Sequence, residues 1–314
     1  MSGPPSATAE VRVAVRRCVA DLSPDTLVLA AVSGGADSLA LAVALAFERP
    51  GSAALVVDHA LQAGSAQVAA RAAQVCTGLG LTATVLTGSG EQSGGPAGGP
   101  GPEGRARALR YALLERAALE RGAATVLLGH TLDDQAETVL LGLARGAGAR
   151  SLSGMARTRG LWRRPLLGVR RAQTRQVCLE AGVAPWEDPH NADPAYARVR
   201  VRTDLLPAFE AALGPGIAEA LARTADQLRE DADALDALAE GTGDVARLAA
   251  LSPALRARAV KRWAEQGCGR SVTHAQVAAL RALVEDWRGQ GPVALPGGVL
   301  VRRTGSFLVV LRDD

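Results

Sequence analysis

One segment of the sequence combines glycines, hydroxyl groups and a carboxylate in a pattern suited to binding phosphate. It reads Ser-Gly-Gly-Ala-Asp-Ser and stands between an apolar run and a segment of helical length. Two adjacent glycines let the backbone turn tightly and bring several amides close to an anion, and the start of the next helix adds its positive dipole end. The candidate phosphate-binding residues are Ser33, Gly34, Gly35, Ala36, Asp37 and Ser38.

Asp37 needs a separate explanation, because a carboxylate repels phosphate unless a metal ion lies between them. We therefore interpret Asp37 as a ligand of Mg²⁺ or as the acceptor of a hydrogen bond from Mg²⁺-bound water. Lys261 is the only lysine in the chain, so the lysine of a Walker A motif cannot contribute here. A Ser-Gly-Gly turn alone is a weak signal in a chain with 35 glycines, but its place between a predicted strand and a predicted helix favours phosphate binding.

A second segment places three carboxylates at the start of a predicted helix. Asp133, Asp134 and Glu137 come shortly after Gly129 and His130. A helix dipole stabilises negative charge at this position, and the carboxylates could hold a metal ion or a cationic amine. A plain acidic helix start is the alternative interpretation. His130 could equally pack in the core or cap the helix, so the pattern leaves its role open.

Alternating apolar runs and Ala-rich segments indicate the elements that carry both groups. Short apolar runs predict buried parallel strands at 27–32, 53–57, 81–86 and 125–128. Segments of helical length lie between them, at 38–47, 65–79 and 105–121. Strands that alternate with helices predict an α/β fold with a doubly wound parallel sheet, whose ligands bind at the carboxyl ends of the strands. Both candidate groups follow a predicted strand at that edge.

The balance of charge reverses along the chain and indicates a second, smaller domain. Residues 145–179 contain nine Arg and no Asp or Glu, whereas residues 219–244 contain eight acidic residues and two Arg. A Leu-Gly-Pro-Gly break lies between them. We therefore predict domains at 1–212 and 213–314. The second domain is expected to be mainly helical and to end in a β-hairpin that turns at Gly305.

The composition is that of a folded globular protein, with 48% hydrophobic and 21% charged residues. No run of about 18 uninterrupted apolar residues and no signal-peptide pattern occurs, so we expect a cytoplasmic protein without a membrane partner. The four cysteines are isolated in the sequence, which argues against a zinc or iron–sulfur site. The net charge of +3 is too small to indicate nucleic-acid binding by itself.

The complete string Ser-Gly-Gly-x-Asp-Ser resembles the signature of the N-type ATP pyrophosphatases, the PP-loop family. This resemblance implies a sheet of the adenine nucleotide alpha hydrolase-like type. It also implies that ATP is cleaved between its α and β phosphates and that AMP is transferred to an oxygen. Phosphate binding without a lysine side chain is consistent with that family.

Further segments resemble the tRNA(Ile)-lysidine synthetase family within this group. Val57-Asp58-His59 and residues 129–138 match its pattern, the second with high specificity. Other matching positions are Glu103, Arg107, Arg110, Tyr111, the run Arg163-Arg164-Pro165-Leu166-Leu167 and a block from Trp186 to Pro207. The similarity extends over residues 25–210 and, more loosely, over the tail from Val272. The sequence departs from the family pattern at Ala60, Gln62 and Val199.

The resemblance implies a ligase that uses ATP and Mg²⁺ to join free L-lysine to the wobble cytidine of tRNA(Ile) with a CAU anticodon. An adenylated cytidine would be the intermediate, and AMP and pyrophosphate the other products. The implied catalytic residues are Asp37, Asp133, Asp134 and Glu137, with Asp37 and Asp133 as metal ligands. ATP would also contact Asp58, His59, Arg107, Gly129 and His130. The tRNA would contact Arg110, Arg163, Arg164, Arg198, Arg200 and Arg202, and a homodimer is one assembly to test.

Two alternatives lie in different functional classes. Another adenylating enzyme of the same family, such as a tRNA cytidine thiolase or an amidotransferase-type synthetase, would share the loop, but the thiolase requires paired cysteines that this sequence lacks. A non-catalytic nucleotide-binding or RNA-binding protein on the same fold would have no reason to keep Asp37 together with the carboxylates at 133–137. The sequence therefore favours a catalyst over a binding module.

Overall fold

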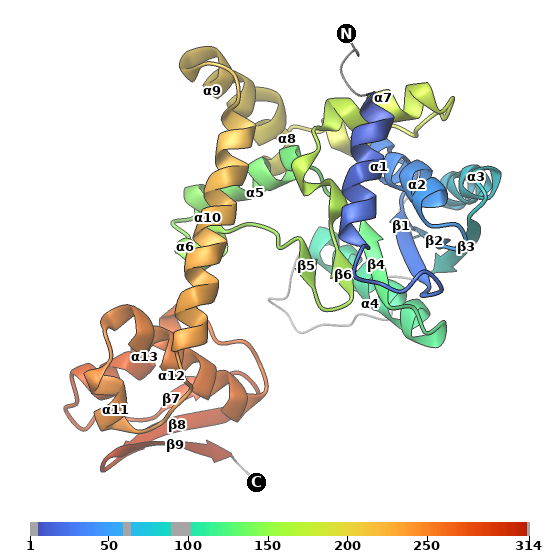
Figure 1. Ribbon diagram of the computed structural model, residues 1–314. Helices are drawn as coiled ribbons and strands as arrows, with labels where there is room; N and C mark the ends of the chain where they lie inside the picture. Colours follow the sequence, from blue (N-terminus) through green and yellow to red (C-terminus); the bar gives the residue numbers. More distant parts are fainter. Residues whose placement is uncertain (1–5, 59–63, 89–101, 313–314) are drawn as a thin grey trace. The chain divides into compact units, whose positions relative to one another are not determined.

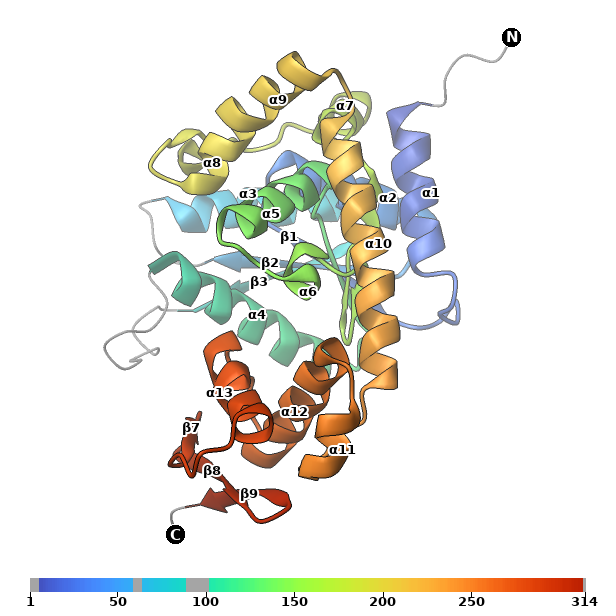
Figure 2. The same ribbon diagram turned by 90° about the vertical axis from the view of Figure 1, so that its left-hand side faces the viewer.

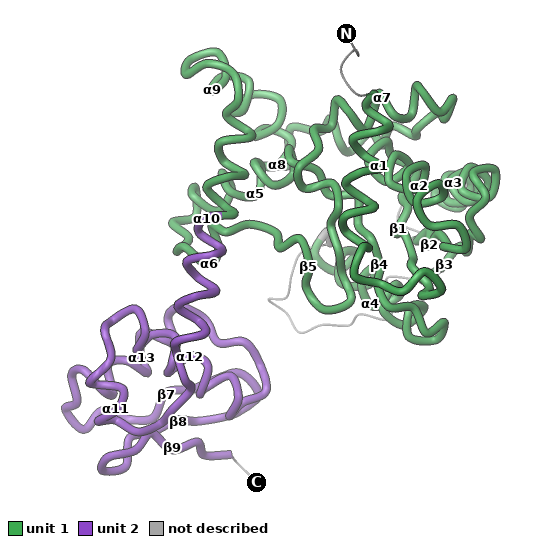
Figure 3. Tube along the Cα trace, in the orientation of Figure 1, with its two compact units in different colours: residues 1–226 green, residues 227–314 purple. Residues whose placement is uncertain are grey.

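The structure is a computed structural model that describes residues 6–58, 64–88 and 102–312. The chain forms two compact units, residues 1–226 and 227–314 (Figure 3). The units divide within helix α10 (Ile217–Leu238). The domain boundary predicted between residues 212 and 213 stays a prediction.

The first unit is built on a six-stranded sheet with the order β3-β2-β1-β4-β6-β5. The first five strands in this order, β3, β2, β1, β4 and β6, are parallel, and β5 is an antiparallel edge strand. The strands are β1 (Val28–Val32), β2 (Ala53–Asp58), β3 (Thr82–Thr87), β4 (Thr125–Leu128), β5 (Thr158–Arg159) and β6 (Trp162–Arg163). The doubly wound parallel sheet predicted from the sequence is thereby confirmed.

Helices cover both faces of this sheet (Figures 1 and 2). One face packs on α1 (Ala7–Cys18), α2 (Ala36–Glu48), α3 (Ser65–Gly78) and α7 (Arg171–Glu180), and the other on α4 (Pro102–Glu120). Side chains of β1 alternate between the two cores: Val28 and Ala30 face α2, whereas Leu29 faces α4. Burial of both faces explains why the central strands read as continuous apolar runs in the sequence.

The strand order reverses between β1 and β4, and this point positions the site. From β1 the sheet continues to β2 and β3 on one side, and from β4 to β6 and β5 on the other. The chain leaves β1 for α2 and leaves β4 for α5 (Leu132–Ala144) at the same edge. A crevice at such a switch point is where α/β sheets bind ligands.

A smaller group of helices completes the first unit beside α5. These are α6 (Ala149–Leu152), the 3₁₀ helices η2 (Pro165–Gly168) and η3 (Pro189–Ala192), α8 (Ala197–Arg200), the π-helical turn η4 (Val201–Leu205), α9 (Leu206–Leu213) and the first part of α10. Leu132 and Leu140 of α5 pack against Val201, Leu206 and Ala222. This core fixes the start of α5 relative to η4.

The second unit has its own core and a three-stranded antiparallel sheet. Its elements are the end of α10, α11 (Val245–Ala250), α12 (Pro253–Cys268), α13 (His274–Glu285), β7 (Val293–Leu295), β8 (Val299–Thr304) and β9 (Phe307–Arg312). Strands β8 and β9 form the predicted hairpin, and Gly305 turns with a φ of 57°. Leu248, Leu280, Leu283 and Val301 are fully buried there. The mainly helical C-terminal region ending in a hairpin is therefore confirmed.

In the described part of the chain, no single helix is long and apolar enough to cross a membrane. The bent pair Ala197–Leu213 and Ile217–Leu238 would meet the length and composition requirements only when taken together.

Candidate active site between β1 and β4

The loop between β1 and α2 keeps its shape through its own serines. The backbone N–H of Ser33 donates to Ser38 Oγ at 3.1 Å, and the Ser38 hydroxyl donates to Gly35 O at 2.9 Å. Helix α2 begins at Ala36 after Gly35, which has no side chain to accept a hydrogen bond from the first amides of the helix. Those amides and the helix dipole are therefore available to an anion.

Two glycines at this crevice are required by geometry. Gly34 has a φ of 87°, in the left-handed region, and a Cβ there would lie 3.4 Å from the Cβ of Ala72. A Cβ on Gly129, at the end of β4, would lie 3.0 Å from Asp37 O. Because any larger residue would push this segment away from α2, Gly129 lets the end of β4 approach the start of α2 closely.

Asp37 lies in the first turn of α2 and is tied to helix α7. Its Oδ1 accepts a hydrogen bond from Thr174 Oγ1 at 2.5 Å, and its Oδ2 lies 3.4 Å from Arg171 Nε. Burial raises the pKa of Asp37, and Asp134 adds to this effect, whereas Thr174 and Arg171 oppose it. A cation bound at Asp37 Oδ2 would favour the charged form of this carboxylate.

Asp134 performs two tasks with its two oxygens. Its Oδ2 accepts hydrogen bonds from the backbone N–H of Thr131 at 2.8 Å and from the Thr131 hydroxyl at 3.0 Å, which completes a capping box. Its Oδ1 lies 2.8 Å from Arg171 Nη2. Burial works to raise the pKa of Asp134, but Arg171 and the Thr131 amide hold it below its ordinary value. The acidic cap considered from the sequence is thus present, together with a second charged contact.

Glu137 is fully buried and is surrounded by arginines. Arg202 donates to both of its oxygens, at 2.8 and 3.3 Å, from the π-helical turn η4. Arg198 lies 3.5 Å from Oε2 and Arg171 lies 3.3 Å from Oε1. Arg198 and Arg202, which the sequence assigned to tRNA contacts, therefore lie at the carboxylates. A buried carboxylate needs such partners to stay charged.

The sequence did not single out Arg171, which is one of the nine arginines at 145–179, as a site residue. As the first residue of α7 it contacts Asp37, Asp134 and Glu137, and its backbone N–H donates to Asp133 Oδ2 at 2.7 Å. Burial disfavours its charge, but the surrounding carboxylates raise its pKa. The available signal was nine arginines without an acidic residue at 145–179, next to a helix start rich in carboxylates.

His130 lies at the end of β4 among arginines. Its Nδ1 is buried and has no hydrogen-bond partner within the described residues. Burial lowers the pKa of His130 to about 4; Asp134 opposes the shift, whereas Arg164, Arg107 and Arg110 add to it. The imidazole is therefore neutral near pH 7. The three arginines lie close enough for their positive charges to oppose protonation of His130.

The other arginines predicted from the sequence have varied surroundings. Arg163 pairs with Asp21 through both terminal nitrogens, at 2.5 and 2.8 Å, and its side chain is 14% exposed. Arg164 is buried and donates to Ala156 O. Arg200 is exposed and donates to the carbonyls of Pro194 and Ala195. Arg107 is exposed, and its Nη2 donates to the Tyr111 hydroxyl at 3.3 Å.

Two residues expected to contact ATP, Asp58 and His59, come at the end of β2 and directly after it in the sequence. Asp58 is buried at the carboxyl end of β2, next to β1. His59 lies outside the described residues, as do the family departures at Ala60 and Gln62. Val199, the third departure, is buried in α8.

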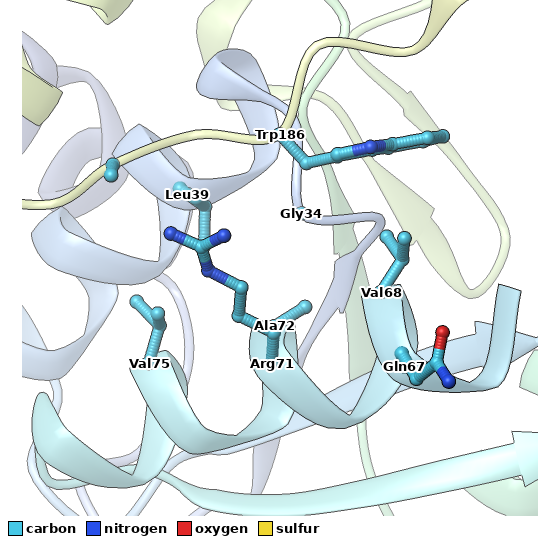
Figure 4. Close-up of a pocket in the computed structure, with 9 residues that line it drawn as sticks. Gly34, Leu39, Gln67, Val68, Arg71, Ala72, Val75 and Trp186 are labelled. Atoms are coloured by element: carbon cyan, nitrogen blue, oxygen red, sulfur yellow. The ribbon is translucent and has the colours of Figure 1, made fainter. Parts of the chain in front are cut away.

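Two cavities flank the site. One of about 160 Å³ lies beside Gly34, between α2, α3 and the segment carrying Trp186, whose backbone N–H donates to Gly34 O at 2.9 Å (Figure 4). Arg71 extends from α3 toward Leu39 in this mostly apolar space (Figure 4). A second cavity, of about 150 Å³, is lined by charged groups, including Asp133, Glu137, Arg170, Arg171 and Arg202.

The carboxylates at the site do not form a closed set of metal ligands, but they suit a divalent cation that is also held by substrate phosphates. Among the described residues, no group of three or more His, Cys, Asp and Glu side chains is arranged to hold a metal ion. Mg²⁺ does not require such a cage, because it commonly binds through one or two carboxylates together with substrate phosphates. Asp37, in the candidate phosphate-binding segment at 33–38, fits this second arrangement.

The sequence matches two protein families. The PP-loop domain family matches residues 8–209, and the TilS substrate binding domain family matches residues 244–307. The first match alone covers more than half of the chain and includes every candidate site residue.

Curated relatives align over nearly the full chain. The tRNA(Ile)-lysidine synthase of Leifsonia xyli subsp. xyli (strain CTCB07) is 52% identical over 302 residues, which cover 90% of each chain. The tRNA(Ile)-lysidine synthase of Thermobifida fusca (strain YX) is 50% identical over 329 aligned positions and covers both chains completely.

A solved structure shares the fold. The U34-tRNA thiolase NcsA from Methanococcus maripaludis superposes with a TM-score of 0.59 over 71% of this chain and 80% of its own, at 19% sequence identity. Identity this low supports the common sheet and helix arrangement only.

Proposed function

This chain belongs to the tRNA(Ile)-lysidine synthase family, and from that premise we propose which of its residues perform each step of the family's reaction. The protein is a ligase that uses ATP to form lysidine in tRNA(Ile). The sequence identity of 50% to the curated Thermobifida fusca enzyme, over the full length of both chains, carries this conclusion. It also decides against a non-catalytic binding protein and against a different adenylating enzyme of the PP-loop family.

In the first step, we propose that the ring carbonyl oxygen of the wobble cytidine attacks the α-phosphate of ATP and that pyrophosphate leaves. The amides at the start of α2 and the hydroxyls of Ser33 and Ser38 would hold the phosphates. Asp37 and Asp133 would bind Mg²⁺, which spreads the phosphate charge. The residues that would complete the ATP site are Asp58, His59, Arg107, Gly129 and His130.

In the second step, we propose that the ε-amine of free lysine attacks the adenylated ring carbon, that AMP leaves, and that the amine gives up a proton. A carboxylate must hold the incoming ammonium and help to remove that proton. Asp134 and Glu137 lie in the first two turns of α5, one strand away from the phosphate loop. Support for this assignment comes from the short separation implied by their shared contact with Arg171.

For tRNA binding we propose contacts from Arg110, Arg163, Arg164, Arg198, Arg200 and Arg202. Arg198 and Arg200 are exposed and could reach RNA without rearrangement, whereas the buried Arg164 would first have to become accessible. Phosphate contacts from arginine orient the RNA without reading its sequence. The second unit, which matches the substrate binding domain family, is expected to make tRNA contacts of its own.

Three proposals concern the whole protein. We place the reaction in the cytoplasm, and we keep 1–212 as the catalytic domain and 213–314 as a domain that binds tRNA or supports the fold. A homodimer stays a prediction.

Pyrophosphate release with tRNA(Ile) transcripts, with and without lysine, tests the proposed order of steps. Adenylation before lysine attack predicts a single-turnover burst of pyrophosphate without lysine and continuous turnover with it. A transcript whose wobble base is uridine serves as the control. If the cytidine transcript released no pyrophosphate until lysine was added, the order proposed here would be wrong.

A further inference from the structure

Arg171 occupies the place where two positively charged ligands are expected. Its guanidinium lies between Asp37 Oδ2 at 3.4 Å and Asp134 Oδ1 at 2.8 Å, and only 16% of its side chain is exposed. Asp37 belongs to the phosphate loop and Asp134 to the start of α5. One internal cation therefore bridges the proposed metal ligand and the proposed lysine ligand.

The remaining oxygens of these two carboxylates are committed to the fold. Asp37 Oδ1 accepts from Thr174, and Asp134 Oδ2 accepts from Thr131. In the described part of the chain, Asp37 Oδ2 contacts Arg171 alone, and Asp134 Oδ1 contacts Arg171 with Arg202 farther away at 3.8 Å. A cation that binds Asp37 or Asp134 must therefore use the oxygen that Arg171 now holds.

Glu137 differs from these two carboxylates, because it does not depend on Arg171. Arg202 donates to both Glu137 oxygens and Arg198 lies 3.5 Å away. If Arg171 moved, Glu137 would stay paired, whereas Asp37 Oδ2 and Asp134 Oδ1 would lose their closest partner. Arg171 also lines the charged cavity of about 150 Å³, which offers its side chain space to move.

We propose that Arg171 is an exchangeable internal cation that leaves both carboxylates when either Mg²⁺–ATP or lysine binds. This inference rests on the proposed assignment of Asp37 and Asp134. A second positive charge within about 4 Å of the guanidinium would be repelled, so each ligand must displace it. Displacement by one ligand frees the oxygen needed by the other, and the two ligands therefore bind with positive coupling, which is reciprocal by linkage.

The exchange also favours the correct amino acid. Lysine brings an ammonium that replaces the charge of the guanidinium at Asp134. A neutral amino acid brings none and would leave the carboxylate without a partner if Arg171 moved away. Arg171 is thus a positioning residue that acts through the carboxylates and contributes to specificity.

Isothermal titration of lysine into the full chain tests the proposal, with and without Mg²⁺ and an ATP analogue that has a methylene group between the α and β phosphates. We expect the analogue to tighten lysine binding by about tenfold in the wild type. In Arg171→Met, lysine should bind about tenfold more tightly without the analogue, and the coupling should fall below about twofold. Arg116→Met, on the exposed side of α4, is the matched control and should behave as the wild type.

Arg171→Lys provides a second variant if the methionine variant does not fold. A lysine ammonium is compact and cannot bridge both oxygens as the guanidinium does, so the coupling should be smaller than in the wild type. The proposal is overturned if the wild type shows no coupling, or if a folded Arg171 variant binds lysine more weakly or keeps the full coupling.

Asp134→Asn separates this inference from the function on which it rests. If this variant binds lysine as tightly as the wild type, the proposed lysine site is wrong. If it binds lysine more weakly but Arg171→Met binds no more tightly than the wild type, only the exchange proposal fails.

Discussion

Two regions of the site lie at neighbouring strand ends but are built in different ways. The first is the candidate phosphate loop, residues 33–38, and the second is the carboxylate centre, in which Arg171 lies among Asp37, Asp133, Asp134 and Glu137. In the loop, the hydrogen bonds of the serines join residues three to five positions apart, such as Ser33 with Ser38, and the backbone N–H of Trp186 adds one bond from a distant segment. In the carboxylate centre, Arg171 meets Asp37 across 134 positions and Glu137 across 34. We infer that substitutions in the loop act through backbone geometry, whereas those in the centre act through the balance of charge.

Asp37 belongs to both regions, and its replacement should have the largest effect. Asp37→Asn removes the charge that would hold the metal but keeps the hydrogen bond from Thr174 and the helix start. We expect pyrophosphate release to fall by at least about 100-fold, because electrostatic stabilisation of the transferring phosphate is lost. Single-turnover release with tRNA measures this effect.

The control for this variant is Asp286→Asn, at an exposed carboxylate of the second unit. Both variants should unfold at temperatures close to that of the wild type. Normal pyrophosphate release by Asp37→Asn would remove Asp37 from the catalytic site.

Asp134→Asn, in the carboxylate centre, should raise the lysine concentration that the enzyme needs. An asparagine can still accept the hydrogen bond from the Thr131 amide, so the helix cap persists while the charge is lost. A hydrogen bond to a charged group contributes about 1.5–3 kcal/mol, so the lysine concentration for half-maximal rate should rise roughly 10-fold to 100-fold. Steady-state rates at varied lysine and varied ATP measure both requirements.

A rise of similar size in the ATP requirement would assign Asp134 to the metal instead. If neither requirement changed, Asp134 would act only as the partner of Thr131 in the capping box of α5.

Gly34→Ala should disturb the phosphate loop through geometry alone. An alanine with φ in the left-handed region is strained by about 1–2 kcal/mol, and its Cβ would also lie 3.4 Å from the Cβ of Ala72, at the short end of van der Waals contact. Gly122→Ala is the matched control, since Gly122 also has a positive φ but has no neighbouring atom within 4 Å of a built Cβ. Chemical denaturation should show a larger loss of unfolding free energy for Gly34→Ala. Equal losses would mean that Ala72 moves away freely.

The same contrast explains how much could be predicted from sequence. Apolar runs predicted β1 to β4 within one residue at each end, because buried central strands leave continuous hydrophobic stretches. The loop was predicted because its motif is local. The strands β5 and β6 are only two residues long, and no periodicity marks them.

Predictions for the carboxylate centre were less complete, because its partners come from distant segments. Asp133, Asp134 and Glu137 were predicted from their spacing, but Arg171 and Thr174 were not. Arg202 was expected to contact RNA and lies 2.8 Å from Glu137. A count of charges shows that arginines are in excess, but only tertiary structure shows which of them meet a carboxylate.

The smallest predicted effect concerns Arg200 and Arg163, which the sequence assigned alike to tRNA. Arg200 is exposed and uses Nη1 for two backbone carbonyls, which leaves its other nitrogens directed to no partner within the described residues. Removal of one arginine–phosphate interaction lowers the slope of log K against log salt by about one unit. We expect Arg200→Ala to lower the slope by about one, with little change in stability, as measured by fluorescence polarisation of labelled tRNA at several KCl concentrations.

Arg163→Ala should give a different result, because Asp21 already neutralises this guanidinium through two hydrogen bonds. To reach a phosphate, Arg163 would have to loosen that pair and its bond to the carbonyl of Cys18. The change in slope should therefore be smaller than for Arg200→Ala, and it should come with a lower unfolding temperature, because α1 and β6 lose their link. A full one-unit change with unaltered stability would show that Arg163 faces the RNA and that its pairing with Asp21 gives way when tRNA binds.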